Sequence, residues 1–320
     1  MRNGTKLWLV IAVCLILIGC FALAGVMTVL HWDFGRLSTN SYETNEYEID
    51  EDYTNISIVT DTADITLVPC EGEQSTVVCY ERENAKHAVT VRDGTLLIEL
   101  NDTKQWYEHI GISFDTPKVT LYIPEGAYGA LCIKLSTGDV TVPRDFQFES
   151  LDISASTGAV KNAASASGLM RIKTTTGHIR VENVSAGVLD LSVSTGRMTL
   201  ADAMCAGKVT LTVSTGKAFL SDVTCQSLTS SGNTGDISLK NVIATETISI
   251  KRTTGDVELE DCDAAELCIS TDTGDVQGSL LSEKVFIVHT RTGEFDVPKT
   301  TSGGKCEVTT STGDIEFEIR

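Results

Sequence analysis

The chain has 320 residues, and 42% of them are hydrophobic, which provides enough apolar material for a packed core and excludes intrinsic disorder. Asp and Glu number 44 against 25 Lys and Arg, so the formal net charge is −19 at pH 7. This excess of acidic residues excludes a basic nucleic-acid-binding protein, because such proteins bind the phosphate backbone through cationic side chains. The 5 prolines and 26 glycines exclude collagen-like and proline-rich material.

The first segment is apolar and long enough to cross a membrane. No residue from Leu7 to Leu30 is charged, and about 20 apolar residues suffice for a helix to span the hydrocarbon layer. Arg2 and Lys6 precede the segment, so the positive-inside rule predicts a cytoplasmic N-terminus and places the rest of the chain outside. A cleaved signal peptide and a lipid on Cys20 are the alternatives, and the long apolar run on both sides of Cys20 favours the membrane helix.

The dipeptide Thr-Gly recurs at a spacing of 19 or 20 residues. Self-similarity at such a period is typical of a solenoid, whose units stack because none can bury its apolar face alone. Positions seven and five before the glycine, and two and four after it, are mostly apolar and alternate with polar residues, which predicts β-strands. The ten glycines are Gly138, Gly158, Gly177, Gly196, Gly216, Gly235, Gly255, Gly274, Gly293 and Gly313.

Each unit is therefore predicted as a strand, a Thr-Gly turn, a second strand and a second corner. The glycine is expected in a type II turn, where a positive φ disfavours other residues. Adjoining coils should lie about 4.8 Å apart with their strands parallel. At the second corner, six residues after the glycine, five consecutive units carry Asn or Asp, which we interpret as stacked Asx turns: Asn183, Asp202, Asp222, Asn241 and Asp261.

The same apolar offsets occur earlier in the chain, around Ala63, which stands where the later units have glycine. Less regular strands are predicted over 75–80, 88–100 and 118–123, with a turn at Asp93-Gly94, and we interpret this region as a cap. At the other end, the charged alternation Glu316, Glu318 and Arg320 is expected to protect the edge of the last coil.

The predicted fold class is all-β, a parallel β-solenoid of about ten or more coils that is expected to be right-handed and follows one transmembrane helix. The predicted segments are a cytoplasmic N-terminus (1–6), a transmembrane helix (7–30), a linker (31–45), an N-terminal β cap with irregular coils (46–125) and regular solenoid repeats (126–320).

Three runs carry a family resemblance: Lys134–Val142, Asn233–Leu239 and Ser311–Phe317 each contain Thr-Gly-Asp followed by alternating apolar residues. They resemble the bacterial β-strand-repeat family of unknown function that is labelled "putative adhesin", and the likeness covers residues 46–320. The resemblance implies a parallel β-helix and, for many members, a single N-terminal membrane helix. For some members it implies an accessory role in envelope-stress systems of the Lia type. It implies no catalytic residues.

The residue after the glycine is acidic in the four units nearest the C-terminus. Asp256, Asp275, Glu294 and Asp314 should stack about 4.8 Å apart and repel one another, and a bound calcium ion would relieve that repulsion. The alternative is an ordinary solvated acidic edge, because Asp is common in turns and the chain lacks the nonapeptide of calcium-binding β-rolls. No other cofactor is expected.

Eight cysteines follow the apolar segment. Cys205 and Cys225 both fall nine residues after their glycines, so they should stack one coil apart, within the Cα separation that a disulfide accepts; reduced thiols are the alternative. The five histidines show no spacing typical of a metal site or a catalytic triad and are mostly expected at the surface. The aromatic cluster Gln105–Ile110 is interpreted as a lid on the first coil, with a recognition patch as the alternative.

Together these observations predict a single-pass membrane protein of the cell envelope that displays an acidic β-solenoid outside the cell. A repeat surface offers wide contact without a pocket, so we expect a binding or scaffold protein, an adhesin, with a protein or glycan partner at the cell surface and no catalysis. One alternative is an accessory component of envelope-stress sensing that acts through membrane proteins. The other is a polysaccharide-active β-helix enzyme, which requires a groove with a convergent acid and base.

Overall fold

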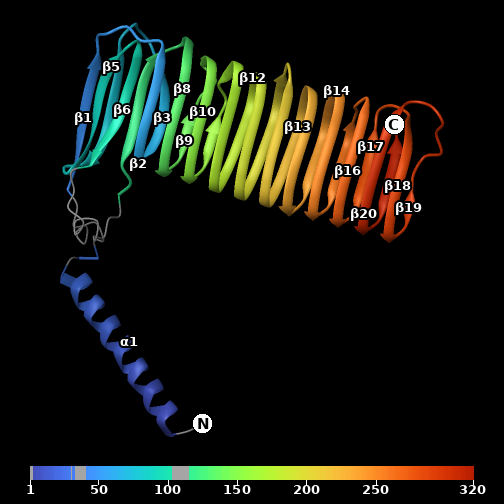
Figure 1. Ribbon diagram of the computed structural model, residues 1–320. Helices are drawn as coiled ribbons and strands as arrows, with labels where there is room; N and C mark the ends of the chain where they lie inside the picture. Colours follow the sequence, from blue (N-terminus) through green and yellow to red (C-terminus); the bar gives the residue numbers. More distant parts are fainter. Residues whose placement is uncertain (1–2, 30, 33–40, 103–114) are drawn as a thin grey trace.

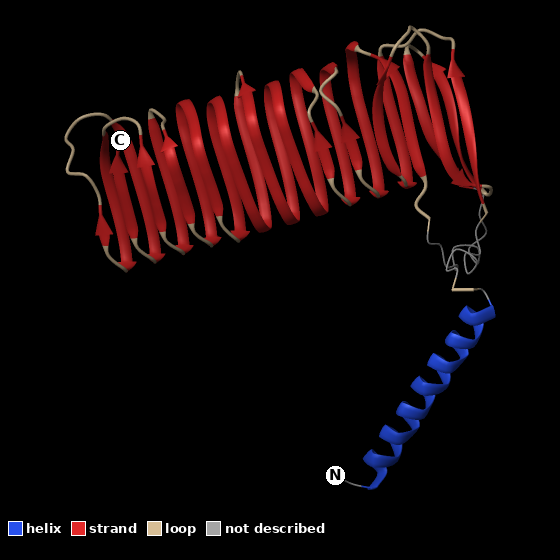
Figure 2. Ribbon diagram, turned by 180° about the vertical axis from the view of Figure 1, so that it is seen from behind, coloured by secondary structure: helices blue, strands red, loops and turns tan. Residues whose placement is uncertain are grey.

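The computed structural model describes residues 3–29, 31–32, 41–102 and 115–320, so the predicted aromatic lid lies outside the described residues. The described chain consists of one helix, α1 (Asn3–Val29), and strands that form one continuous solenoid (Figures 1 and 2). The strands before the regular coils are β1 (Tyr42–Ile49), β2 (Asn55–Thr62), β3 (Asp64–Cys70), β4 (Ser75–Arg82), β5 (Ala85–Arg92), β6 (Thr95–Asp102) and β7 (Lys118–Pro124).

The regular coils run from β8 onward. Their strands are β8 (Gly126–Thr137), β9 (Val140–Val142), β10 (Phe146–Thr157), β11 (Val160–Asn162), β12 (Ser165–Cys205), β13 (Lys208–Thr234), β14 (Ile237–Thr254), β15 (Val257–Cys262) and β16 (Glu266–Thr273). The last strands are β17 (Val276–Leu280), β18 (Lys284–Thr292), β19 (Phe295–Asp296), β20 (Gly304–Thr312) and β21 (Ile315–Ile319).

Helix α1 contains the predicted membrane segment. Within it, Trp8–Val29 has a mean hydropathy of 3.0, and by length and composition this stretch can cross a membrane. The apolar window within this stretch is not buried inside the protein. The sequence-based prediction of one N-terminal apolar helix is confirmed.

The regular coils are parallel and in register. Leu189 lies opposite Val209, and Gly196 lies opposite Gly216, so equivalent residues of adjoining coils form columns. The pairing continues through the corners, which is why β12, β13 and β14 are long and pass from one side of the coil to the other. The predicted parallel β-solenoid is confirmed.

The glycine corners differ from the predicted type II turn. The ten glycines have φ angles between 120° and 150°, more extended than the value of about 80° at that position of a type II turn. A Cβ atom added to Gly216 would lie 1.7 Å from the carbonyl oxygen of Gly196. Glycine is therefore required by the close stacking of successive corners as well as by its positive φ.

The second corner carries the predicted Asn and Asp residues in the left-handed region. The φ angles of Asn183, Asp202, Asp222, Asn241 and Asp261 are 55°, 50°, 54°, 51° and 52°. Asn and Asp adopt this conformation more readily than other non-glycine residues. Asn241 Nδ2 also donates to Asp222 Oδ1 at 2.7 Å, so neighbouring corners are joined through their side chains.

At the N-terminal end, the cap lies outside the first coil. Strands β2 and β3 form a coil that pairs directly with β8 and β9 on one side, and with β6 and β7 on the other. Strand β5 pairs antiparallel with β6, and β4 pairs antiparallel with β7 and β1. The predicted turn at Asp93-Gly94 is present, with φ angles of 51° and 69° that suit a tight hairpin.

At the C-terminal end, the spatial order of the coils differs from their order in the chain. Strand β20 lies between β16 and β18, and β21 lies between β17 and β19. The coil of β18 and β19 therefore forms the end of the solenoid (Figure 1). The prediction that Glu316–Arg320 forms the final edge is wrong, because β19 covers β21 on the side away from β17; the Phe317 ring of β21 lies beside Gly278 in an inward column.

One apolar core runs through the solenoid. The inward positions predicted from the repeat are buried in the regular coils, as at Val209, Leu211 and Leu220. In the coil of β18 and β19 the same offsets are only partly covered: Phe286 is half-buried and Phe295 is exposed. The alternation of the sequence thus places side chains inward, while the position of a coil along the solenoid decides whether they are covered.

Candidate functional site

The acidic residues after the glycine corner form a hydrogen-bonded column. Asp256 Oδ1 accepts the backbone N–H of Asp275 at 3.0 Å, and Asp275 Oδ1 accepts the backbone N–H of Asp314 at 2.9 Å. Asp314 Oδ1 accepts the backbone N–H of Glu294 at 2.7 Å. Each aspartate therefore satisfies a backbone donor at the corner of the next coil.

The structure thus brings the four predicted residues together, in the order Asp256, Asp275, Asp314 and Glu294, which follows the inserted coil and not the chain. The hydrogen bonds explain why aspartate recurs at this corner without requiring an ion. Calcium binding along this column stays a prediction.

The same arrangement recurs elsewhere, with one variation that the sequence analysis missed. Asp139 Oδ1 accepts the backbone N–H of Ala159 at 2.8 Å near the other end of the solenoid. In the middle, His178 Nδ1 accepts the backbone N–H of Arg197 at 3.2 Å. His178 stands directly after Gly177, so its place in the repeat was the available signal. Both aspartate and histidine can therefore supply the acceptor at this corner.

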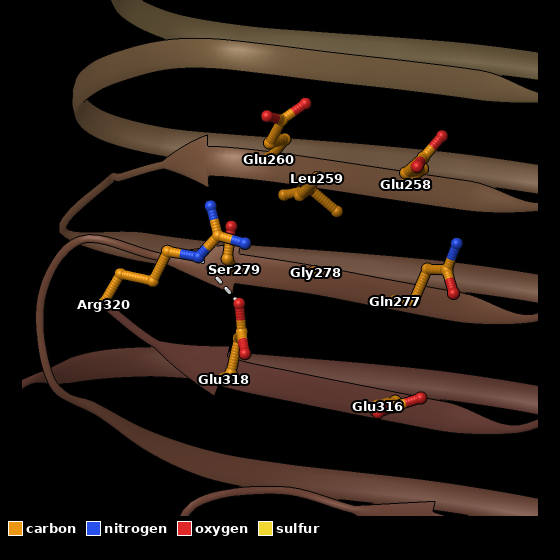
Figure 3. Close-up of a pocket in the computed structure, with 9 residues that line it drawn as sticks. All are labelled: Glu258, Leu259, Glu260, Gln277, Gly278, Ser279, Glu316, Glu318 and Arg320. Atoms are coloured by element: carbon orange, nitrogen blue, oxygen red, sulfur yellow. Dashed lines mark hydrogen bonds and ion pairs between the residues drawn. The ribbon is translucent and has the colours of Figure 1, made fainter.

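An acidic face covers the outer side of β15, β17 and β21, around a hollow shown in Figure 3. Glu258, Gln277 and Glu316 stand opposite one another on these strands. Arg320 closes one side of the hollow, since its Nε lies 2.7 Å from Glu318 Oε1 and its Nη1 lies 3.0 Å from Asp261 Oδ1. Outward columns that repeat acidic residues give an acidic, solvated face, with Arg320 and Lys240, the partner of Glu260, at its border.

Cys205 and Cys225 lie on adjoining coils, as predicted. Their neighbours Met204 and Thr224 are directly opposite in the register of β12 and β13. Both cysteines are buried free thiols, and burial raises the pKa of the Cys225 thiol to about 12. A thiol with a raised pKa is a poor nucleophile, so the pair is packed as small apolar side chains. A disulfide between them under oxidising conditions stays a prediction.

A buried polar cluster occupies the cap and was missed by sequence reasoning. Glu81 Oε2 accepts the backbone N–H of His87 at 2.6 Å and lies 2.7 Å from its Nδ1, while His87 Nε2 lies 2.9 Å from Thr60 Oγ1. Asn45 Nδ2 donates to Glu81 Oε1 at 2.7 Å. The prediction of surface histidines is wrong for His87. The signal was its alternation with Ala85 and Val89 along β5.

The residues of this cluster resemble both a metal site and a catalytic relay. Cys79, Glu81 and His87 place potential metal-ligand atoms within 4.8 Å of one another. Both carboxylate oxygens and both ring nitrogens already have hydrogen-bond partners, and burial raises the pKa of Cys79 to about 12. The contacts Thr60–His87–Glu81 also follow the order of a hydrolase relay, but Thr60 is buried and cannot meet a polysaccharide. The cluster is a satisfied structural network.

Arg252 is a second buried polar residue that the sequence analysis missed. Its Nη2 lies 3.1 Å from Ser230 Oγ and its Nη1 donates to the Val213 carbonyl at 3.3 Å, while Nε lacks a partner among the described residues. Burial lowers its pKa. Gly232 makes room for it, because a Cβ there would lie 1.8 Å from Nη1. The sequence signal was that Arg252 occupies an inward position of its unit and that Gly232 occupies the same position in the adjoining unit.

Comparison with known families gives one match in two parts. The family described as Toastrack DUF4097 matches residues 53–217 and again residues 205–320. Together the two matches extend from the start of the first coil to the last strand. No curated protein matches this chain.

Several solved structures are similar in fold. A putative adhesin from Bacteroides fragilis NCTC 9343 has a TM-score of 0.43 and 14% sequence identity, covering 87% of this chain and 97% of its own. A putative adhesin from Parabacteroides merdae ATCC 43184 has a TM-score of 0.40 and 13% identity, covering 88% and 97%. A putative lipid binding protein from Parabacteroides distasonis ATCC 8503 has a TM-score of 0.39 and 12% identity, covering 87% and 98%.

Proposed function

This chain belongs to the Toastrack DUF4097 family, and from that premise we propose that it is a membrane-anchored binding or scaffold protein of the cell envelope, an adhesin whose solenoid lies outside the cell. The partner in this proposal is a protein or glycan at the cell surface. Catalysis plays no part in it.

The observation that supports this role best is the long outer surface of the solenoid, which repeats the same outward positions from coil to coil (Figures 1 and 2). Such a surface offers wide contact to a macromolecule. An enzyme needs an acid and a base that converge on an accessible groove. In the described part of the chain, the relay-like contact of Glu81, His87 and Thr60 is buried in the cap, and the charged side chains of the face of Figure 3 are carboxylates and Arg320.

The proposed location follows from α1. Its stretch Trp8–Val29 is apolar enough to span a membrane, and Arg2 and Lys6 stand before it. Cations on one flank favour that flank in the cytoplasm, so the solenoid would be exported. The net charge of −19 favours partners that carry cationic groups and predicts that binding weakens as salt is added.

The proposal is tested on the full chain with an epitope tag after Arg320. Antibody should label the tag on intact cells, and the chain should stay with the membrane fraction. Replacing both Arg2 and Lys6 by Glu should reduce surface labelling, whereas Arg171→Glu and Lys173→Glu, which leave the flank unchanged, should not. A tag that is accessible only after the cells are opened would contradict the proposed orientation.

Binding is tested with the same full chain in detergent, immobilised and exposed to purified cell walls, surface glycans and envelope proteins. We expect saturable, salt-sensitive binding to at least one of these. Co-purification only with membrane-embedded signalling proteins, and with no wall, glycan or surface protein, would instead favour the accessory role in envelope-stress sensing.

A further inference from the structure

The coil of β18 and β19 leaves one end of the solenoid open. Strand β18 pairs with β20 alone, and β19 pairs with β21 alone, among the residues that the structure describes. The segment 297–303 packs Val297 against the core and contacts the start of β18, where Thr300 Oγ1 donates to the Lys284 carbonyl. The rest of this strand edge presents backbone N–H and C=O groups without a ladder partner, which is the usual template for pairing with another strand.

The end coil exposes large apolar side chains. Ile287 is 51% exposed and Phe295 is 60% exposed. Ile315, which lies directly opposite Phe295 on the neighbouring coil, is 1% exposed. Phe286 and Val288 point inward yet are only half-buried, because no further coil covers them. The core of the solenoid therefore ends at an uncovered apolar surface.

The charge of this coil also differs from that of the chain. Residues 284–299 contain Lys284, Arg291 and Lys299 against Glu294 and Asp296, a net charge of +1, whereas the whole chain carries −19. Strand β18 contains no carboxylate. Edge strands that must stay unpaired are usually protected by charged side chains. The strand at the edge of the cap, β1, follows this rule with Glu43, Glu46 and Glu48, whereas the middle of β18, residues 285–290, contains no Lys, Arg, Asp or Glu.

We propose that two copies of this chain associate end to end through the coil of β18 and β19. The copies are related by a twofold axis, so that β18 pairs antiparallel with the partner's β18 and the two open cores cover each other. An interface of this kind is isologous: the same patch on both copies buries the same residues.

A second copy fits this end better than an unrelated acidic surface for two reasons. First, the two open ends have the same cross-section, so the inward columns of one copy meet the inward columns of the other. Second, the acidic sides of two solenoids repel each other, while their ends carry almost no net charge, so the end is the face where two copies meet at the lowest electrostatic cost.

The strand sequence suits antiparallel self-pairing. A register centred on Ile287 places Phe286 opposite the partner's Val288, which keeps inward side chains inward on both copies. The same register places Val285 opposite the partner's His289, so the paired residues lie in the part of β18 that the segment 297–303 leaves uncovered. This inference does not depend on the proposed adhesin role, because it rests on the end coil alone.

The mass of the full chain in detergent, measured over a range of concentrations, tests the proposal. The wild-type chain should convert from monomer to dimer as its concentration rises. Ile287→Lys should weaken the dimer about tenfold or more, because it places two ammonium groups at the twofold axis. The matched control is Val188→Lys, another exposed aliphatic residue in the middle of the solenoid, which should leave the dimer unchanged. Equal thermal melts of the two variants would show that both are folded.

A covalent test keeps the result independent of stability. Ile287→Cys places the same thiol on both strands at the centre of the register, at a Cα separation of about 5 Å that a disulfide accepts. Oxidised glutathione should join two chains through this position and be reduced to two molecules of glutathione. Val188→Cys and the wild-type chain should stay uncrosslinked. A wild-type chain that is monomeric throughout, or a dimer that Ile287→Lys leaves intact, would overturn the proposal.

Discussion

The two ends of the solenoid are finished in different ways. At the N-terminal end the chain leaves the parallel pattern, and the antiparallel strands β4 and β5 enclose the polar pair Glu81 and His87. At the C-terminal end the coil of β18 and β19 keeps the parallel pattern and leaves Phe286 half-covered. A change of strand direction therefore closes the core, whereas inserting a coil only changes which coil is left at the end.

The largest effect should come from opening the closed end. Glu81→Ala removes a buried carboxylate that contacts the His87 ring, the His87 backbone N–H and the Asn45 amide, and we expect the loss of these hydrogen bonds to cost about 3–5 kcal/mol in the free energy of unfolding of the cap. Glu81→Gln keeps a carbonyl acceptor and should lose less, and the exposed Glu99→Ala should lose almost nothing. Hydrogen exchange of β4 and β5 measures the change. Equal exchange in all three variants would show that the buried pair does not hold the cap.

The next effect compares the middle of the solenoid with its open end. Gly216→Ala forces a Cβ towards the Gly196 carbonyl and places alanine at a φ of 135°, so we expect a loss of about 3 kcal/mol. Gly293→Ala meets the Gly313 carbonyl in the same way, at a φ of 150°. Because the end coil has a neighbour on one side only, this loss should appear as local exchange in β18 and β19. Urea unfolding should show a much larger loss in the free energy of unfolding for Gly216→Ala than for Gly293→Ala. Equal losses would mean that the end coil is held as firmly as the middle of the solenoid.

A smaller effect is expected along the corner column that runs to the open end. Asp275→Ala removes the acceptor of the Asp314 backbone N–H and should cost about 1 kcal/mol, while Asp275→Asn keeps an acceptor oxygen and should cost little. Thermal melts measure both. The same melts with millimolar calcium test the predicted ion: an upward shift in the wild type that Asp275→Asn abolishes would support calcium, and an unchanged midpoint would leave hydrogen bonding as the reason for the column.

Much of the fold follows from local rules that the sequence shows directly. The two-residue alternation assigns inward side chains such as Val209 and Leu211, and the positive φ of Asp202 and Asp222 follows from their place six residues after a glycine. These features depend on one coil and its neighbours. They repeat along the chain, so a single sequence samples them many times.

The parts that the sequence analysis missed depend on contacts that occur once in the structure and are not part of the repeat. The inserted last coil depends on how Phe317 fills the space beside Gly278, a contact between residues far apart in the chain. The buried Glu81–His87 pair requires that β4 and β5 face each other across the core, and the repeat pattern does not predict this arrangement. The open end is the consequence of both the repeat and the insertion, because alternation points Phe286 inward while the order of coils leaves it uncovered.

Acid should loosen the C-terminal end by a small amount. Lys284 Nζ lies 2.6 Å from Asp263 Oδ1 and joins the start of β18 to the preceding coils. Burial raises the pKa of Asp263, but hydrogen bonds from Lys284 and Ser282 outweigh burial and hold it below the ordinary value. A folded-state pKa below the unfolded one means that the stabilisation is fully present above the unfolded pKa and is lost as the pH falls through the folded pKa.

Hydrogen exchange of β18, corrected for the intrinsic effect of pH, should therefore rise by up to about fivefold on acidification, as expected for a partly exposed ion pair. Asp263→Asn should show the raised exchange already at neutral pH and no further increase in acid. Strand β12, in the middle of the solenoid, serves as the internal control. An acid-induced rise that is the same in β12 and β18, or that persists in Asp263→Asn, would mean that the ion pair does not hold the end coil in place.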